Sequence, residues 1–170
     1  MPLTLQPLDS RHLPGMEAIV ADPDALRFTR IPEPPPPGFA ATWLSRYRDN
    51  EERIGFAIEE DGTFLGLALA PEIDREGRQL ELGYIVHPDA RNRGVATRAL
   101  VLLTRWAFDE LGALRAYLYI NVENVPSLRV ARRAGYVREG LLRSLHLKRD
   151  LRGDAELWSR LPGDPEPVGG

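Results

Sequence analysis

Hydrophobic and polar residues alternate at 3–8 and at 114–122, and this alternation is typical of half-buried β-strands. Together with apolar runs bounded by turn residues, these stretches predict strands at 3–8, 53–60, 63–73, 78–88, 114–122, 136–150 and 153–161. Asp61-Gly62 separates two of these stretches, and Asp-Gly between apolar runs predicts a tight hairpin turn. Pro88 marks the end of another strand, because proline cannot donate to a sheet ladder.

Apolar residues at helical spacing predict helices between these strands. They lie at 9–22, at 39–50, within 91–111 and at 126–135. Pro126 and Gly135 stand at the start and end of the last one, which is the usual placement of these two residues. The order of elements predicts an α/β (α+β) fold with a mixed central sheet of about seven strands and about four flanking helices.

The strand–helix–strand unit from 80 to 122 predicts a right-handed crossover between parallel strands, with a ligand site beside the start of its helix. That start reads Arg91-Asn92-Arg93-Gly94-Val95-Ala96. Two arginines at the positive end of a helix are unfavourable unless an anion binds there. Gly94 would allow close approach of a phosphate. A solvated arginine-rich turn is the alternative.

Composition narrows the class of protein. The chain has 170 residues, which fits one domain at 1–161, and its Pro/Gly-rich end at 162–170 predicts a flexible tail. The proline run at 32–37 predicts a stiff loop, more than a docking ligand for another domain. The net charge of the whole chain is −3, which argues against a nucleic-acid binder.

The absence of cysteine excludes thiol catalysis, disulfides and cysteine-based metal sites. The spacing of His12, His87 and His146 matches no zinc motif, so we expect no metal. The N-terminal residues lack a signal-peptide pattern, and no apolar run approaches the roughly 20 residues of a membrane span. We therefore expect a cytoplasmic protein that contacts neither membranes nor nucleic acids.

Three segments carry a resemblance to a known family. The segment 91–96 fits a Q/R-x-x-G-x-G/A pyrophosphate loop, and the strand "LGYIVHP" at 82–88 precedes it directly. The segment "NVPSLRVARRAGYVREG" at 124–140 fits an N-x-x-S…A-x-x-x-G-F/Y…E-G pattern. Together with the order of elements, these segments make the chain resemble the GNAT acetyltransferase superfamily, and within it the RimJ/RimL-type N-acetyltransferases, over roughly 1–161.

The resemblance implies acetyl-CoA as acetyl donor and coenzyme A as product. Backbone N–H groups of 91–96 would hold the pyrophosphate, and the strand around Val86 would pair with the pantetheine arm. One amide of that strand would polarise the thioester carbonyl, as an oxyanion hole does. The implied cofactor-binding residues are Ile85, Val86, His87, Arg91, Asn92, Arg93, Gly94, Val95, Ala96 and Asn124.

The same resemblance implies candidate catalytic residues. Ser127 would protonate the leaving thiolate, because Ala131 stands where many members have a tyrosine. Its alternative role is to bond nearby backbone in the first helical turn. The base could be Glu81, His146 at the position of an acidic residue in RimL-like members, or a water chain. Glu81 could instead be an exposed strand carboxylate, and His146 a partly packed strand residue.

The acceptor is less defined than the donor. Phe39, Trp43 and Tyr47 could line an amine pocket, although core packing is the simpler role. We read Glu139 as structural and expect Tyr136 to pack below the cofactor. The leading hypothesis is direct attack of a primary amine on the thioester in a ternary complex, with a protein N-terminal α-amine as acceptor.

Two alternatives stay open. One is a small-molecule acceptor such as an amino acid, a polyamine or an antibiotic. The other is a non-catalytic acyl-CoA-binding protein on the same fold. A homodimer is frequent in the family, but the sequence does not decide the oligomeric state.

Overall fold

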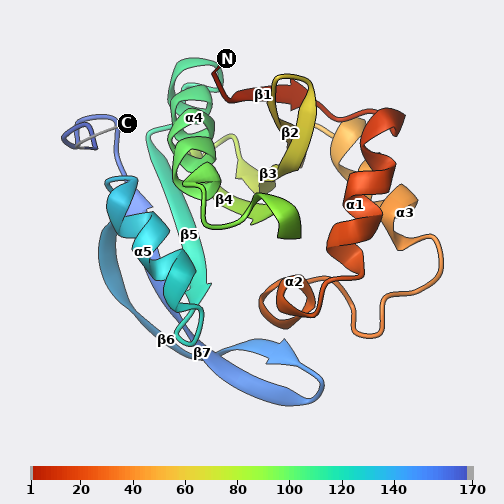
Figure 1. Cartoon of the computed structure of the whole chain (residues 1–170). Helices are drawn as coiled ribbons and strands as arrows, with labels where there is room; N and C mark the ends of the chain where they lie inside the picture. The colour runs from red at the N-terminus through yellow and green to blue at the C-terminus, as the bar shows by residue number, and fades with distance from the viewer. Residues whose placement is uncertain (1, 168–170) are drawn as a thin grey trace.

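One seven-stranded mixed sheet organises the computed structural model, which describes residues 2–167 (Figure 1). Its strand order is β1-β2-β3-β4-β5-β7-β6. The strands are β1 (Thr4–Pro7), β2 (Ile54–Glu60), β3 (Thr63–Asp74), β4 (Gln79–Val86), β5 (Arg115–Asn121), β6 (Val137–Lys148) and β7 (Leu151–Arg160). The β4–β5 pair is parallel and the other neighbours are antiparallel. The predicted fold class is confirmed.

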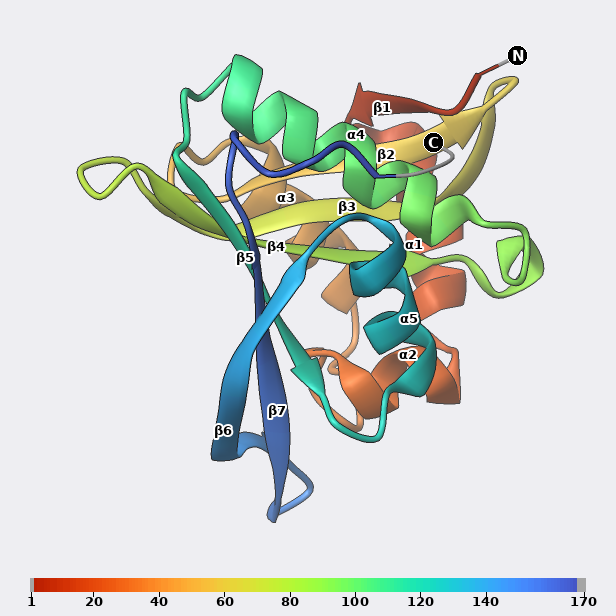
Figure 2. The same ribbon diagram turned by 90° about the vertical axis from the view of Figure 1, so that its left-hand side faces the viewer.

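Helices cover both faces of this sheet. They are α1 (Leu13–Val20), α2 (Pro23–Phe28), α3 (Phe39–Arg48), α4 (Val95–Asp109) and α5 (Val125–Arg133), with short 3₁₀ helices at Ser10–His12 and Pro88–Ala90. The helices α1 and α3 pack on one face, and α4 with α5 on the other (Figures 1 and 2).

The helix predicted at 9–22 is divided in the structure. Asp9 caps the 3₁₀ turn, and α1 then begins with Pro14 in its first turn, where the missing N–H of proline costs nothing. The helix α2 was not predicted, because it has six residues, too few to show an apolar period. Its start nevertheless carries the usual signals: the Asp22 carboxylate accepts the N–H of Ala25, and Pro23 follows the cap.

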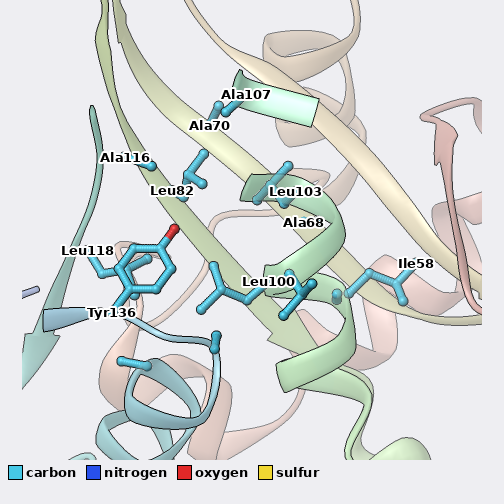
Figure 3. Close-up of a cluster of buried hydrophobic side chains, with 14 of the residues drawn as sticks. Ile58, Ala68, Ala70, Leu82, Leu100, Leu103, Ala107, Ala116, Leu118 and Tyr136 are labelled. Carbon is cyan, nitrogen blue, oxygen red and sulfur yellow. The ribbon is translucent and has the colours of Figure 1, made fainter. Parts of the chain in front are cut away.

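The strand β3 shows how the sequence builds two cores from one strand. Alternate side chains point to opposite faces, so Leu67 and Leu69 join the cluster beneath α1 and α3. Ala68 and Ala70 point the other way and leave room for Leu100 and Leu103 of α4, both fully buried (Figure 3).

A fork opens in the middle of the sheet, between β4 and β5. These strands pair at three positions, which end at Glu81 opposite Tyr117. Beyond this point they diverge, and β5 turns away with β7 and β6 (Figure 2). The predicted parallel pairing within 80–122 is therefore confirmed, although it is short.

Contacts between distant segments bridge the two sides of this fork. The tip of the β6–β7 hairpin reaches the loop before α3, where the Lys148 ammonium donates to the carbonyl of Thr29 at 3.0 Å and to that of Ile31. Next to it, the Arg149 guanidinium pairs with the carboxylate of Glu33 in the proline-rich loop. These bonds fix the loop beside the cleft described below.

The C-terminal residues lie against the end of β7 and α4. The Glu166 carboxylate is 3.6 Å from the guanidinium of Arg160 and 3.5 Å from that of Arg105. Residues 168–170 of the predicted flexible tail lie outside the described residues, and its flexibility stays a prediction. Within residues 2–167, no helix is long and apolar enough to cross a membrane.

Candidate active site

A cleft of about 960 Å³ occupies the fork between β4 and β5. The helices α2 and α3 line it on one side, and α4 and α5 on the other. The three predicted catalytic residues, Ser127, Glu81 and His146, all line this cleft, although they come from a helix and two different strands.

The start of α4 forms one end of the cleft. Gly94 is the N-cap in a left-handed conformation with φ of 71°, and no side chain caps the helix. A Cβ atom added to Gly94 would find no heavy atom within 4 Å, so the space above the helix start is open. Uncapped N–H groups facing open space fit a phosphate or pyrophosphate.

The arginines beside this start already have protein partners. The guanidinium of Arg91 pairs with the carboxylate of Asp22 and lies 3.6 Å from that of Asp24. Burial alone would raise the pKa of Asp22, but the hydrogen bond and charge of Arg91 outweigh it and lower this pKa. Arg93 lies 3.6 Å from Glu60 and does not line the cleft. Backbone amides of α4, more than arginine side chains, are therefore the groups left without a partner for an anion.

The backbone of β4 offers hydrogen-bonding groups to the cleft. The N–H of His87 donates to the carbonyl of Leu65 at 2.8 Å, so this residue faces β3. Backbone N–H and C=O groups of successive residues alternate between the two sides of an antiparallel strand. Those of Tyr84 and Val86 therefore point away from β3, toward the opening between β4 and β5. Ile85 and Val86 line the cleft as predicted, whereas His87 does not and instead packs its ring against Phe64.

Tyr84 and Ser127 form a hydroxyl pair in the cleft, with their oxygens 2.6 Å apart. Asn124 caps α5 by accepting the N–H of Ser127 at 3.3 Å, which fixes the serine at the third helical position. Burial raises the pKa of Tyr84 to about 12, although the bond to Ser127 opposes this shift. Tyr84 therefore stays protonated at neutral pH and can donate to the serine or through it.

Glu81 lies at the fork with its carboxylate held by Arg30. One guanidinium nitrogen is 2.8 Å and 3.0 Å from the two carboxylate oxygens. Glu81 is 7% exposed, and burial raises its pKa, partly opposed by the charge and hydrogen bond of Arg30. Since Glu81 and Tyr84 are three residues apart on one strand, their side chains emerge on opposite faces of β4.

His146 is half-buried on β6 and reaches the same cleft. Burial lowers its pKa, and the positive charge of Arg30 lowers it further. The imidazole is therefore neutral at neutral pH and able to accept a proton.

The three aromatic residues of α3 combine core packing with a place in the wall of the cleft, and their role in an amine pocket stays a prediction. Phe39 and Trp43 are buried in the core beneath α3, and together with Tyr47 they also line the cleft. Tyr136 lies in the opposite core, where its hydroxyl is 2.7 Å from that of Thr104. Glu139 pairs with Arg115 of β5, a contact between strands.

Sequence reasoning missed Tyr84 and Arg30. The position of Tyr84 could have been predicted from the strand pattern. Its side chain lies two residues after that of Leu82 and therefore on the same face of β4, which α4 and α5 cover. Its partner, Ser127, is distant in sequence and could not be read from that pattern. Arg30 comes from a short segment between α2 and α3 without a period of its own, and nothing in the sequence pairs it with Glu81.

Known proteins share this fold and parts of this sequence. Spermidine N(1)-acetyltransferase of Escherichia coli K12 is 34% identical over 94 residues, which are 55% of this chain and 50% of that protein. Ribosomal-protein-serine acetyltransferase of the same strain is 26% identical over 107 residues, which are 62% of this chain and 59% of that protein. The chain thus spans about half the length of the first relative.

Among solved structures, RimL, a ribosomal L7/L12 α-N-protein acetyltransferase in complex with coenzyme A, has a TM-score of 0.85 at 17% identity. The alignment covers 95% of this chain and 94% of that one. The forked sheet and its helices are therefore arranged as in that protein. The acetyltransferase (GNAT) domain family matches residues 2–137, and the chain belongs to this family.

Proposed function

We propose that this protein transfers an acetyl group from acetyl-CoA to a primary amine. The observation that carries the proposal is the arrangement around β4. The Glu81 carboxylate and the Tyr84 hydroxyl emerge on opposite faces of this strand beside one cleft, and Ser127 of α5 pairs with Tyr84. A base on one side of a thioester and an acid on the other are what acyl transfer to an amine requires.

The donor would bind along the fork. The N–H groups of Val95, Ala96 and Thr97 in the first turn of α4 would hold its pyrophosphate. The gap-facing backbone groups of Tyr84 and Val86 would bond its pantetheine arm, and one of these amides would polarise the thioester carbonyl. The membership in the GNAT family supports acetyl-CoA as this donor.

The reaction is a direct transfer. The amine nitrogen attacks the carbonyl carbon, its proton passes to the Glu81 carboxylate directly or through water, and the carbon–sulfur bond breaks. The Tyr84–Ser127 pair delivers a proton to the departing sulfur. A cysteinyl acyl-enzyme is excluded because the chain has no cysteine.

A protein N-terminal α-amine is the acceptor that the resemblance to RimL-type enzymes favours. The relatives also include a spermidine acetyltransferase, so the small-molecule alternative is retained. The homodimer and the cytoplasmic location stay predictions.

Release of free coenzyme A tests the proposal. We expect purified protein to release thiol from acetyl-CoA only when a primary amine is present, and mass spectrometry to find the acetylated amine in equal amount. A protein that binds acetyl-CoA but acetylates no amine in a panel of peptides, amino acids and polyamines would be the non-catalytic alternative. Failure to bind acetyl-CoA would overturn the proposal entirely.

The pH dependence of turnover should reveal the base. Glu81 accepts a proton only when ionised, so kcat falls as the pH drops through its pKa. Burial raises this pKa and Arg30 lowers it, so Arg30→Ala should raise it further and move the acidic limb of kcat to higher pH. Profiles of kcat against pH check this, because kcat reports groups in the substrate complex.

Two variants separate Glu81 from other groups. Removal of Arg30 would also raise the pKa of His146, so Glu81→Gln and His146→Gln must be compared. We expect the limb to disappear only in Glu81→Gln. Arg27→Ala is the control, since Arg27 lines the cleft but pairs with Glu123. An unchanged limb in Glu81→Gln would exclude Glu81 as the base.

A further inference from the structure

The charges that line the cleft are not balanced. Seven arginines and three carboxylates contribute to its lining, although the whole chain carries a net charge of −3. Each of the three carboxylates already has an arginine of the cleft beside it. The pairs are Asp24 with Arg91 at 3.6 Å, Glu81 with Arg30 at 2.8 Å and Glu123 with Arg27 at 3.3 Å.

Four arginines of the cleft are left over. Arg129 and Arg133 lie one turn apart on α5, on the side of the cleft where α4 begins. Arg46 lies in the last turn of α3, and Arg53 directly precedes β2. Within residues 2–167, neither Arg46 nor Arg53 has a hydrogen bond or an ion pair to a carboxylate.

Arg46 and Arg53 lie at the Glu81 end of the cleft. Sheet register places the start of β2 there, since Gly55 is opposite Leu69 and Leu69 is opposite Gly83. Both charges also act on the hydroxyl of Tyr47, whose pKa burial raises and these arginines lower. Arg30, Tyr47 and Glu81 line the same cleft, and the Tyr47 side chain packs beside Gly55 near the start of β2.

The donor cannot supply the anion for these two arginines. Glu81 and Val86 are five residue steps apart on β4, which is about 17 Å at the usual rise of a strand. The proposed pyrophosphate site at Gly94 lies beyond Val86, at the far end of this distance. An anion beside Arg46 and Arg53 must therefore belong to the acceptor.

We propose that the acceptor is an amine that also bears a carboxylate, which Arg46 and Arg53 bind while the amine faces Glu81. This inference rests on the proposed function and specifies its substrate class. The carboxylate could be that of a free amino acid or an acidic side chain next to a peptide N-terminus. A polyamine, which carries only positive charge, would be repelled by the same arginines.

Matched acceptors test the proposal. Acetylation is measured at saturating acetyl-CoA for a peptide that begins Ser-Asp-Glu, one that begins Ser-Lys-Lys, free aspartate, its diamide and spermidine. We expect a carboxylate-bearing acceptor to have a kcat/KM at least about tenfold above its cationic or neutral counterpart, from one charge-assisted contact. Whether the peptide or the amino acid is preferred identifies the source of the carboxylate.

Variants assign this preference to the two arginines. In Arg46→Ala/Arg53→Ala, the kcat/KM of the carboxylate-bearing acceptor should fall about tenfold to a hundredfold, mainly through KM, and that of the neutral acceptor should not change. Arg48→Ala is the matched control, because Arg48 lies on the same helix, pairs with Asp49 and does not line the cleft. Equal losses for all acceptors, or a wild-type preference for spermidine, would overturn the proposal.

Direct binding separates this inference from the proposed function. The same acceptors are titrated calorimetrically into the protein saturated with coenzyme A. If no acceptor is acetylated yet the acidic ones still bind through Arg46 and Arg53, the proposed activity fails and the carboxylate site stands. If acetylation occurs but binding shows no preference for a carboxylate, the activity stands and this inference fails.

Discussion

Replacing Gly94 with glutamate should reduce acetyl-CoA affinity by about a hundredfold or more. The added carboxylate would occupy the open space above the start of α4, where the N–H groups would hold the pyrophosphate. Like charges at close range in a partly desolvated site repel strongly, and the side chain also blocks the approach of the phosphates. Isothermal titration of acetyl-CoA into the wild type and the variant measures this change.

Gly62→Glu is the matched control for this variant. Gly62 has a φ of 74° against 71° for Gly94, and neither position has a heavy atom within 4 Å of an added Cβ. Both substitutions therefore introduce the same charge and a similar backbone strain of about 1–2 kcal/mol. Gly62 lies in the β2–β3 turn, away from the cleft, so this variant should bind acetyl-CoA normally. Equal affinities of the two variants would reject the anion site at α4.

Removing the hydroxyl of Tyr84 should reduce kcat about a hundredfold while the affinity for acetyl-CoA is retained. Tyr84→Phe keeps the ring in place but leaves Ser127 without its partner at 2.6 Å. If the two hydroxyls act as one proton donor, Ser127→Ala should cost a similar factor, within the range of about 10²–10⁴ for general acid catalysis. Steady-state rates and acetyl-CoA titrations of both variants check this.

The double variant shows whether the hydroxyls act together. Residues of one unit give non-additive effects, so Tyr84→Phe/Ser127→Ala should be hardly slower than either single variant. Tyr136→Phe is the control for loss of a buried tyrosine hydroxyl, since its partner is Thr104 in the core and it does not line the cleft. Full activity of Tyr84→Phe together with an inactive Ser127→Ala would mean that the serine acts alone.

Sequence patterns predicted the sheet because each strand is marked by signals within its own segment. The apolar run in β3 and the Asp61-Gly62 turn are local signals, and so is the start of α4 at Gly94. The fork is not local, because the β4–β5 ladder stops after three residue pairs and no property of either strand alone determines this. The parallel unit was therefore predictable, but the opening between its strands was not.

The candidate site divides in the same way. Ser127 and Glu81 could be singled out because they lie in or near segments that resemble the family. Tyr84 lies in one of those segments, but it becomes a candidate proton donor only through its hydrogen bond to Ser127, 43 residues further along. For Arg91, the sequence pattern suggested an anionic ligand as the partner of its charge. In the structure its partner is Asp22, the N-cap of α2, and this helix was not predicted.

The three-pair junction between β4 and β5 also has a thermodynamic consequence. Beyond Glu81, the backbone groups of β4 that point toward β5 have no strand to pair with. The two halves of the sheet, β1 to β4 and β5 to β7, therefore share few hydrogen bonds. A ligand along this free edge would supply the bonds that a neighbouring strand would otherwise make. Separation of the halves then costs additional free energy, which grows with ligand concentration as RT ln(1 + [L]/Kd). Resistance of the folded protein to local opening, and hence to proteolysis, would follow the supply of its own acetyl donor.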